Sequence, residues 1–161
     1  MLDMFMFKFD GDPCSYINMD KKDVMKQFQK ALNAGENARV NDSKMTFLTY
    51  WSGANQICRW LIENSGVVHN FHGPYHLMEE EVRMLAMTCK TVLEKGVDKN
   101  GQPVEAVCQW FLPTLNGPDF GDVDYDENYL QEVKLTYNFL NELLQTTNWN
   151  NETILLYVEW E

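Results

Sequence analysis

The order of apolar and polar positions along the chain predicts strands near both of its ends. Residues 2–9 are apolar on both faces, as expected of a central strand, and the turn residues Gly11-Asp12-Pro13 end this run. Residues 153–160 alternate large apolar side chains with the period of a strand. Residues 104–112 fit either a strand or a short helix, and the strand is favoured.

Other segments repeat apolar side chains at the 3.6-residue period of a helix. They are residues 20–35 behind the potential N-cap Asp20, residues 46–64, residues 77–95, and a segment that begins at a capping box formed by Asp124 and Glu127. Between the second and the third, Ser65-Gly66 and Gly73-Pro74 predict a loop.

Strands near both ends with helices between them predict an α+β fold. In this fold about four helices pack on a small sheet that includes the N- and C-terminal strands. The chain has 161 residues, 45% of them hydrophobic, which suffices for one packed core, and no low-complexity linker divides it. We therefore expect residues 1–161 to form a single domain.

Charge is distributed unevenly along the chain, whose formal net charge is −11. Residues 1–99 carry 12 basic and 13 acidic side chains, whereas residues 100–161 carry Lys134 alone against 11 acidic side chains. Such an acidic half repels a phosphate backbone, so binding to nucleic acid is disfavoured. It favours a basic partner surface instead.

Cysteine spacing and hydropathy indicate a cytoplasmic protein. Cys14, Cys58, Cys89 and Cys108 are far apart and form no Cys-x-x-Cys pair, so reduced and mostly buried thiols are expected. The apolar start of the chain contains charged residues and falls short of the ~20 apolar residues that cross a bilayer. Neither a signal peptide nor contact with a membrane is expected.

The familiar nucleotide-binding motifs are missing from the sequence. Asp119-Phe120-Gly121 matches the magnesium-binding triplet of protein kinases, but no glycine-rich loop and no His-Arg-Asp motif accompany it. A Walker A loop and a Rossmann fingerprint are also missing. The triplet therefore does not indicate a kinase.

Three acids at alternate positions, Asp122, Asp124 and Asp126, imitate the start of a calcium-binding loop. Such a loop needs glycine at its sixth position and glutamate at its twelfth, whereas this chain has Glu127 and Val133 there. We therefore expect no metal. The acids are interpreted as a helix cap within a solvated acidic turn, or as part of a surface that binds a partner.

His69, His72 and His76 form the one histidine cluster of the sequence. Gly73-Pro74 interrupts any helix that would align them, so a solvated loop is favoured over a metal site. No Gly-x-Ser-x-Gly turn pairs a nucleophile with these histidines. A small hydrolase remains an alternative without an assigned catalytic residue, and no cofactor is expected.

Two segments contain more aromatic, amide and glycine residues than a core requires. In residues 50–60, Gly53, Asn55 and Trp60 lie off the main apolar face of the predicted helix. Residues 112–129 form a loop with proline and glycine that leads into a capped helix. Together they could line a pocket in which aromatic rings stack on a nucleotide-like ligand and Asn55 supplies a donor and an acceptor.

These two segments also carry a resemblance to a known group of proteins. The first reads Tyr-Trp-x-x-Ala-Asn-x-Ile-x-x-Trp, and the second reads Leu-Pro-Thr-x-x-Gly-x-x-Phe-Gly-x-x-x-Tyr-Asp-Glu-x-Tyr. In both patterns the chain resembles, over most of its length, a family of small uncharacterised proteins of bacteriophages and bacteria. The resemblance implies no activity, but it suggests a phage-type accessory protein in the cytoplasm of a bacterial host cell.

The chain departs from the family pattern at several positions. Ser52 and Gly53 stand where the family has an Arg-Lys pair, Cys58 stands at a usual histidine, and Asp119 stands at a usual aromatic residue. The missing pair removes two cations, which argues against an anion-binding role in this chain.

The favoured function is that of a non-enzymatic binding protein, namely a counter-defence inhibitor whose acidic C-terminal half occupies a basic host protein surface. The alternatives are a protein that binds or sequesters a small nucleotide-like ligand, and a small hydrolase. The candidate residues for binding a ligand or partner are Gly53, Asn55, Trp60, Thr114, Gly117, Phe120, Asp122, Asp124 and Asp126.

Overall fold

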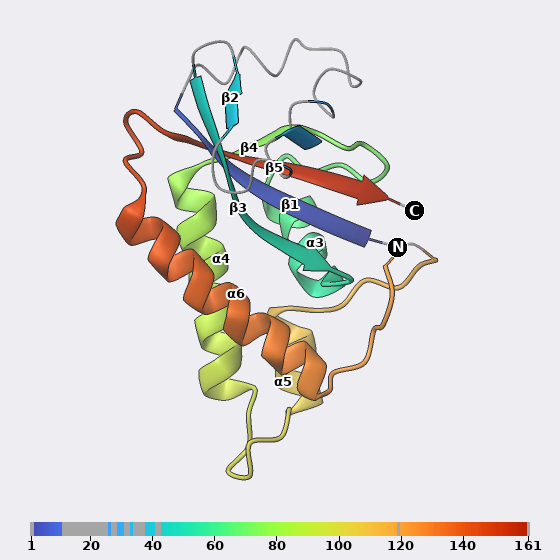
Figure 1. The fold of residues 1–161 in the computed structure, drawn as a ribbon. Coiled ribbons are helices and arrows are strands. Elements are labelled where there is room, and N and C mark those ends of the chain that lie inside the picture. Colours follow the sequence, from blue (N-terminus) through green and yellow to red (C-terminus); the bar gives the residue numbers. More distant parts are fainter. Residues whose placement is uncertain are drawn as a thin grey trace.

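An antiparallel sheet with helices packed on one face forms the protein (Figure 1). The computed structural model describes residues 2–10, 26, 29–30, 33, 38–40, 43–118 and 120–160. The strands are β1 (Leu2–Phe9), β2 (Ala38–Val40), β3 (Ser43–Ser52), β4 (Tyr75–Leu77) and β5 (Thr153–Trp160). The helices are α3 (Asn55–Asn64), α4 (Glu79–Lys95), α5 (Glu105–Phe111) and α6 (Glu127–Thr146).

The sheet places the N- and C-terminal strands side by side. Its strand order is β2-β3-β1-β5-β4, with β1 at the centre. β1 pairs with β5 from Leu2 opposite Trp160 to Phe9 opposite Thr153, and its other edge pairs with β3 with one register shift after Met6. The α+β class, with helices on a sheet that includes both terminal strands, is thereby confirmed.

The central strands are buried on both faces. On β1, Leu2, Met4 and Met6 enter the core beneath the helices, whereas Phe7 and Phe9 are buried as completely on the opposite side. On β5, every residue but one is buried. Burial on both faces explains why these strands read as apolar runs without a polar side.

The helix predicted over residues 46–64 is wrong in its first part. Helix α3 begins only at Asn55, and the residues before it form β3. Aromatic residues favour a strand where a partner strand is available, and β1 provides one along most of β3. The helical spacing of Phe47, Tyr50 and Trp51 is therefore coincidental.

The strand predicted over residues 104–112 is also wrong, because most of this segment is the helix α5. A bridge between Val97 and Pro103 closes the turn at Asn100-Gly101 and returns the chain against the end of α4. α5 buries Cys108 there. Seven residues are too few to show a distinct apolar period, so the packing partner decides the conformation.

The two long helices agree with the sequence in type, whereas the short strands β2 and β4 were not predicted, and residues 75–77 were expected to form a loop and the start of a helix. α4 and α6 confirm two of the predicted helices, and α4 begins at Glu79 because the three residues from Tyr75 form β4. The helix predicted behind Asp20 falls mostly outside the described residues. Among the described residues, no helix is long and apolar enough to cross a membrane.

Gly53 joins β3 to α3 with a φ of 71°, a conformation that other residues adopt at a cost. A Cβ at this position would meet no atom within 4 Å, so only backbone strain opposes a side chain. We expect Gly53→Ala to lower the free energy of unfolding by about 1 kcal/mol, as measured by urea denaturation. Gly66→Ala, which is equally open and lacks the positive φ, is the control. Equal stability of the two variants would contradict this account.

Candidate functional site

Asn55 connects the first turn of α3 to the loop of residues 112–126. Its side chain is completely buried, and its Nδ2 donates to the carbonyl oxygens of Phe120 at 2.8 Å and Asp122 at 2.6 Å. Its Oδ1 accepts from the backbone N–H of Leu115 at 3.2 Å. One carboxamide therefore uses both donor hydrogens and an acceptor to hold three points of the loop.

Thr114 holds the loop from within. Its Oγ1 donates to the carbonyl oxygen of Val123 at 2.9 Å, and its backbone N–H donates to the hydroxyl of Tyr125 at 3.0 Å. Its carbonyl oxygen accepts from Nη1 of Arg59 on α3 at 2.7 Å. Arg59 also pairs with Glu63, so its charge is engaged on the helix surface.

Gly117 and Phe120 fill the space beneath the loop. Phe120 is 5% exposed and contacts the rings of His69 and Trp160, with centroids 5.1 and 5.8 Å away. A Cβ at Gly117 would lie 2.8 Å from the Phe120 ring, which is too close for any side chain. Both residues therefore pack the loop on the sheet, and neither faces solvent as a ligand-binding residue would.

Asp126 is the N-cap of α6. Its Oδ1 accepts from the backbone N–H of Tyr129 at 3.0 Å. The sequence pattern placed this cap at Asp124, which is wrong by two residues. The backbone N–H of Asp124 instead donates to Oδ1 of Asp122 at 2.9 Å. Two aspartates separated by one residue offer alternative caps, and only the extended backbone at Asp126 allows the helix to start there.

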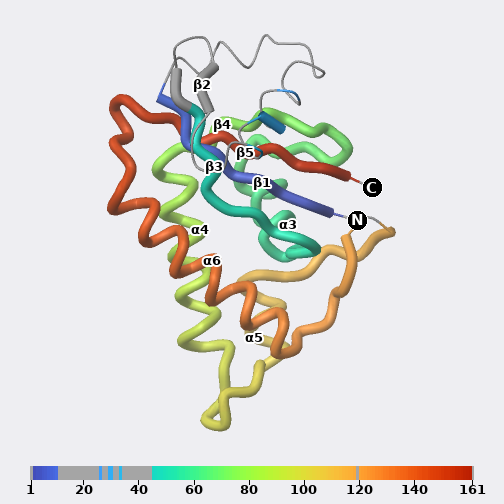
Figure 2. The backbone as a smooth tube through the Cα atoms, in the orientation of Figure 1, coloured from blue at the N-terminus to red at the C-terminus, as the bar shows by residue number. Residues whose placement is uncertain are grey.

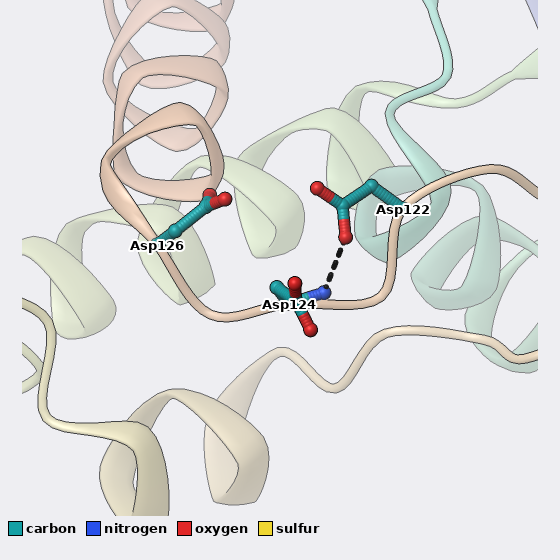
Figure 3. A group of neighbouring side chains, drawn as sticks. All are labelled: Asp122, Asp124 and Asp126. Atoms are coloured by element: carbon teal, nitrogen blue, oxygen red, sulfur yellow. Dashed lines mark hydrogen bonds between the residues drawn. The ribbon is translucent and has the colours of Figure 1, made fainter.

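Three carboxylates converge at the start of α6 (Figure 3). One oxygen each of Asp122, Asp124 and Asp126 lies within 4.8 Å of the others. Figure 3 shows the side chains of Asp122 and Asp126 directed toward each other across the turn. Within the described part of the chain, no other group of His, Cys, Asp and Glu side chains is close enough to share a metal ion.

A pocket opens between the start of α3, the loop and the first turns of α6. Its cavity volume is about 30 Å³, which leaves room for a water-sized group. Its lining residues are Gly53, Gln56, Thr114, Asp122, Asp124, Asp126, Asn128, Tyr129 and Glu132. We call this space the acidic pocket, because four of these residues are acids and none is basic.

The surroundings of Glu132 in the acidic pocket raise its pKa. Gln56, which is 2% exposed, donates from Nε2 to Oε2 of Glu132 at 2.8 Å. Burial raises the pKa of Glu132 above its ordinary value, and the charges of Asp126 and Asp122 raise it further, although the hydrogen bond from Gln56 opposes them. Burial and the neighbouring carboxylates therefore both disfavour the ionised form of Glu132.

The structure brings together most of the residues that the sequence singled out. Five of them line the acidic pocket, namely Gly53, Thr114, Asp122, Asp124 and Asp126. Asn55, Gly117 and Phe120 support the loop beneath it. Trp60 is 7% exposed within the main core and does not line the pocket.

Sequence reasoning missed Gln56, Asn128, Tyr129 and Glu132 as lining residues. Gln56 and Glu132 carried a usable signal, because each is a polar residue next to apolar positions on the inward side of a helix. Tyr129 was assigned to the core, where its ring belongs. Its hydroxyl donates to the carbonyl oxygen of Leu112 at 2.7 Å.

The three histidines point to different surroundings. His69 contacts Phe120 and Trp160, and His72 stacks on Tyr157 at 5.9 Å. His76 is exposed and lines a separate groove of about 380 Å³ between β4 and the connection from α6 to β5. They therefore offer no common site for an ion.

The described cysteines behave as core residues. Cys58, Cys89 and Cys108 are buried and form no disulfide, as the sequence predicted. Burial raises the pKa of Cys58 and Cys89 to about 12 and raises that of Cys108 as well. Their thiols stay protonated at neutral pH, which makes them poor nucleophiles.

Comparisons with protein families, with curated proteins and with solved structures found no match for this chain. The resemblance to small phage and bacterial proteins therefore stays a prediction, and the function must be argued from the acidic pocket itself.

Asn55→Ala tests whether the loop depends on this one side chain. We expect a loss of about 3 kcal/mol in the free energy of unfolding, because three buried backbone groups lose their partner. Urea denaturation measures this change in the free energy of unfolding. Asn138→Ala, an exposed position on α6, is the control and should change stability little. A loss at Asn55 no larger than at Asn138 would show that the loop holds without the carboxamide.

Glu132→Gln tests the potential inside the pocket. A raised pKa means that the folded state binds the proton more tightly, so the ionised carboxylate costs stability at pH 7. This cost disappears as the pH falls through the raised pKa toward the ordinary value of 4.5. We therefore expect Glu132→Gln to be more stable than the parent at pH 7 and equally stable near 4.5.

Urea denaturation across this pH range measures the difference. Glu142→Gln, on the exposed side of α6, should show no such pH-dependent gain. A Glu132→Gln variant that is less stable than the parent at pH 7 would mean that the ionised carboxylate stabilises the fold.

Proposed function

We propose that this chain is a non-enzymatic binding protein that engages a basic surface of a partner protein. The observation that carries the proposal is the acidic pocket, which collects Asp122, Asp124, Asp126 and Glu132 and has no basic residue in its lining. Lys134 is the one basic residue after position 99, so the sequence nearby offers little to neutralise these charges. A cationic group from a partner would relieve their mutual repulsion.

The size of the pocket favours a single cationic side chain. Its cavity of about 30 Å³ is far below the roughly 300–1,000 Å³ of sites that enclose small-molecule ligands. A lysine ammonium is of suitable size, because it is close to a water molecule in volume, and a protein surface could contribute it. The rim acids Asp122 and Asp124 are exposed and would meet further basic residues around it.

The nucleotide-like alternative receives less support from the site. A phosphate group would enter a cluster of carboxylates and be repelled. The aromatic residues expected to stack on a base lie elsewhere: Trp60 is in the core, and Trp51 donates from Nε1 to Oγ1 of Thr136 at 2.9 Å. Asn55 has its hydrogen bonds committed to the loop.

The hydrolase alternative requires an activated nucleophile. The described thiols are held protonated by burial, and the histidines stack on aromatic rings or lie apart from the acidic pocket. These features support binding without catalysis.

The resemblance to phage proteins supplies the biological setting of the proposal. An accessory protein of a phage gains from neutralising a host component, and many host defence proteins must present basic surfaces to nucleic acid. An acidic face would compete for such a surface. The proposed role is accordingly that of a counter-defence inhibitor acting on a basic host protein.

Charge neutralisation in the pocket tests the proposal. The probe is a synthetic peptide of lysine and glutamine, with affinity measured by fluorescence anisotropy at ~20 and ~150 mM salt. We expect the combined change Asp122→Asn, Asp124→Asn and Asp126→Asn to weaken binding about tenfold at low salt and less at high salt. Asparagine keeps the N-cap at position 126, so the fold is preserved.

A matched triple variant separates the pocket from net charge. Glu80→Gln, Glu105→Gln and Glu142→Gln remove the same number of charges from exposed positions on α4, α5 and α6. This variant should lose far less affinity. Unchanged affinity in the aspartate variant, or an equal loss in both variants, would remove the proposal.

A divalent cation is a second candidate occupant, favoured by the 4.8 Å spacing of the three aspartate carboxylates. Calorimetric titration with Ca²⁺ alone distinguishes it. Binding that disappears in the aspartate variant would assign the pocket to a metal ion.

A further inference from the structure

The loop of residues 65–74, between α3 and β4, exposes two large apolar side chains. Val68 is 57% exposed and Phe71 is 56% exposed. Exposed apolar side chains are common when they occur singly, so exposure alone does not indicate an interface. Whether Val68 and Phe71 form an interface depends on how firmly the loop backbone is held and on which groups lie around it.

The backbone of this loop is held in place while the two side chains stay exposed, with the edge of the Phe71 ring against Tyr75. The hydroxyl of Tyr75 accepts from the N–H of Val68 at 3.2 Å, and it also contacts the carbonyl oxygen of Phe71. That carbonyl oxygen accepts from Nε1 of Trp160 at 2.9 Å. Val158 of β5 donates to the carbonyl oxygen of His72 at 2.8 Å. A loop fixed in this way loses little conformational entropy when a partner binds.

The same loop lies against the support of the acidic pocket. His69 contacts the Phe120 ring at 5.1 Å, and Asn55 binds the carbonyl oxygens of both Phe120 and Asp122. Figure 2 shows the loops around residues 65–74 and 112–126 on the side of the molecule where β1 begins and β5 ends. The loop that carries Val68 and Phe71 therefore packs, through His69 and Phe120, on the segment that carries Asp122.

The negative charge of the neighbouring acids determines which class of partner can cover Val68 and Phe71. Anionic lipid and nucleic acid would be repelled by the exposed carboxylates of Asp122 and Asp124. A second copy of this chain would bring the same charges against each other. A basic protein surface is attracted, and burial of apolar side chains at the centre of an interface is what gives such a contact its strength.

We infer that Val68 and Phe71 form an apolar anchor on the loop that packs against Phe120, beneath the segment of Asp122, and that this anchor and the acidic pocket dock together on a partner protein whose basic surface has an apolar centre. This inference rests on the proposed function and specifies its partner. The acidic pocket supplies attraction and orientation, and the anchor supplies affinity that does not depend on salt.

Two peptides of equal length and charge test the inference on the full-length protein. One is composed of lysine and glutamine and the other of lysine and leucine. We expect the parent protein to bind the leucine peptide about tenfold more tightly. Phe71→Ser should bring the two affinities close together while leaving binding of the glutamine peptide and its salt dependence unchanged. Val68→Ser should reduce the preference in the same direction.

Met87→Ser is the matched control, because Met87 is 64% exposed on α4. It should retain the preference for leucine. Thermal unfolding of each variant checks that the fold is intact, and the Val68 variant tests the inference if the Phe71 variant does not fold.

The outcomes separate the inference from the function on which it rests. Three results overturn the anchor alone, provided the glutamine peptide binds through the aspartates. The parent protein shows no preference for the leucine peptide, or the preference survives in both Phe71→Ser and Val68→Ser, or Met87→Ser loses it equally. Failure of both peptides to bind, or binding that ignores the aspartate variant, overturns the proposed function and the anchor with it.

Discussion

The completely buried carboxamide of Asn55 is the interaction on which the candidate surface depends. Its position is set by the sheet, because Gly53 donates to the carbonyl oxygen of Leu2 at 2.8 Å and Asn55 begins α3 directly afterwards. Its bonds reach a segment 60 to 67 residues away in the sequence that has no secondary structure of its own. Buried backbone groups of this loop would cost free energy without hydrogen-bond partners. The carboxamide supplies the hydrogen bonds that a neighbouring strand would otherwise provide. The start of α6 is thereby placed against the start of α3.

This arrangement divides the two distinctive sequence segments into a support and a face. Asn55, Thr114 and Phe120 are engaged inward, through hydrogen bonds or ring contacts, and Arg59 adds a hydrogen bond to the carbonyl oxygen of Thr114. Asp122 and Asp124 are left exposed to solvent. Because the side chains that hold the loop are not the exposed acids, we expect changes in Asp122 and Asp124 to alter the charge of the face more than the stability of the loop. The two segments therefore combine residues that hold the loop in place with a face of exposed acids.

The sequence predicted the terminal strands, α4 and α6 because long apolar runs and helical periods leave few alternatives. It failed over residues 46–52 and 104–112, where the pattern is short and the conformation is chosen by a distant partner, β1 in one case and α4 in the other. For the candidate site, amide, glycine and acid residues at unusual spacings indicated two segments that the structure brings together at the acidic pocket. Glu132 and Gln56 were missed although each is a polar residue on the inward side of a helix, because that signal does not say which residue of the facing helix is the partner.

The charges of the pocket exceed what the fold requires. The N-terminus of α6 needs one cap, which Asp126 provides, and the helix dipole favours acids near it. Glu132 gains little from that dipole, since it lies in the second turn, partly desolvated and facing Asp126 and Asp122, which raises its pKa. A neutral glutamine would keep a hydrogen bond with Gln56 and avoid the repulsion, so stability alone would select against the glutamate. Residues that break a local rule without a structural gain are where function is expected. No basic residue lines the acidic pocket to offset the charge of its carboxylates. A partner can supply that positive charge.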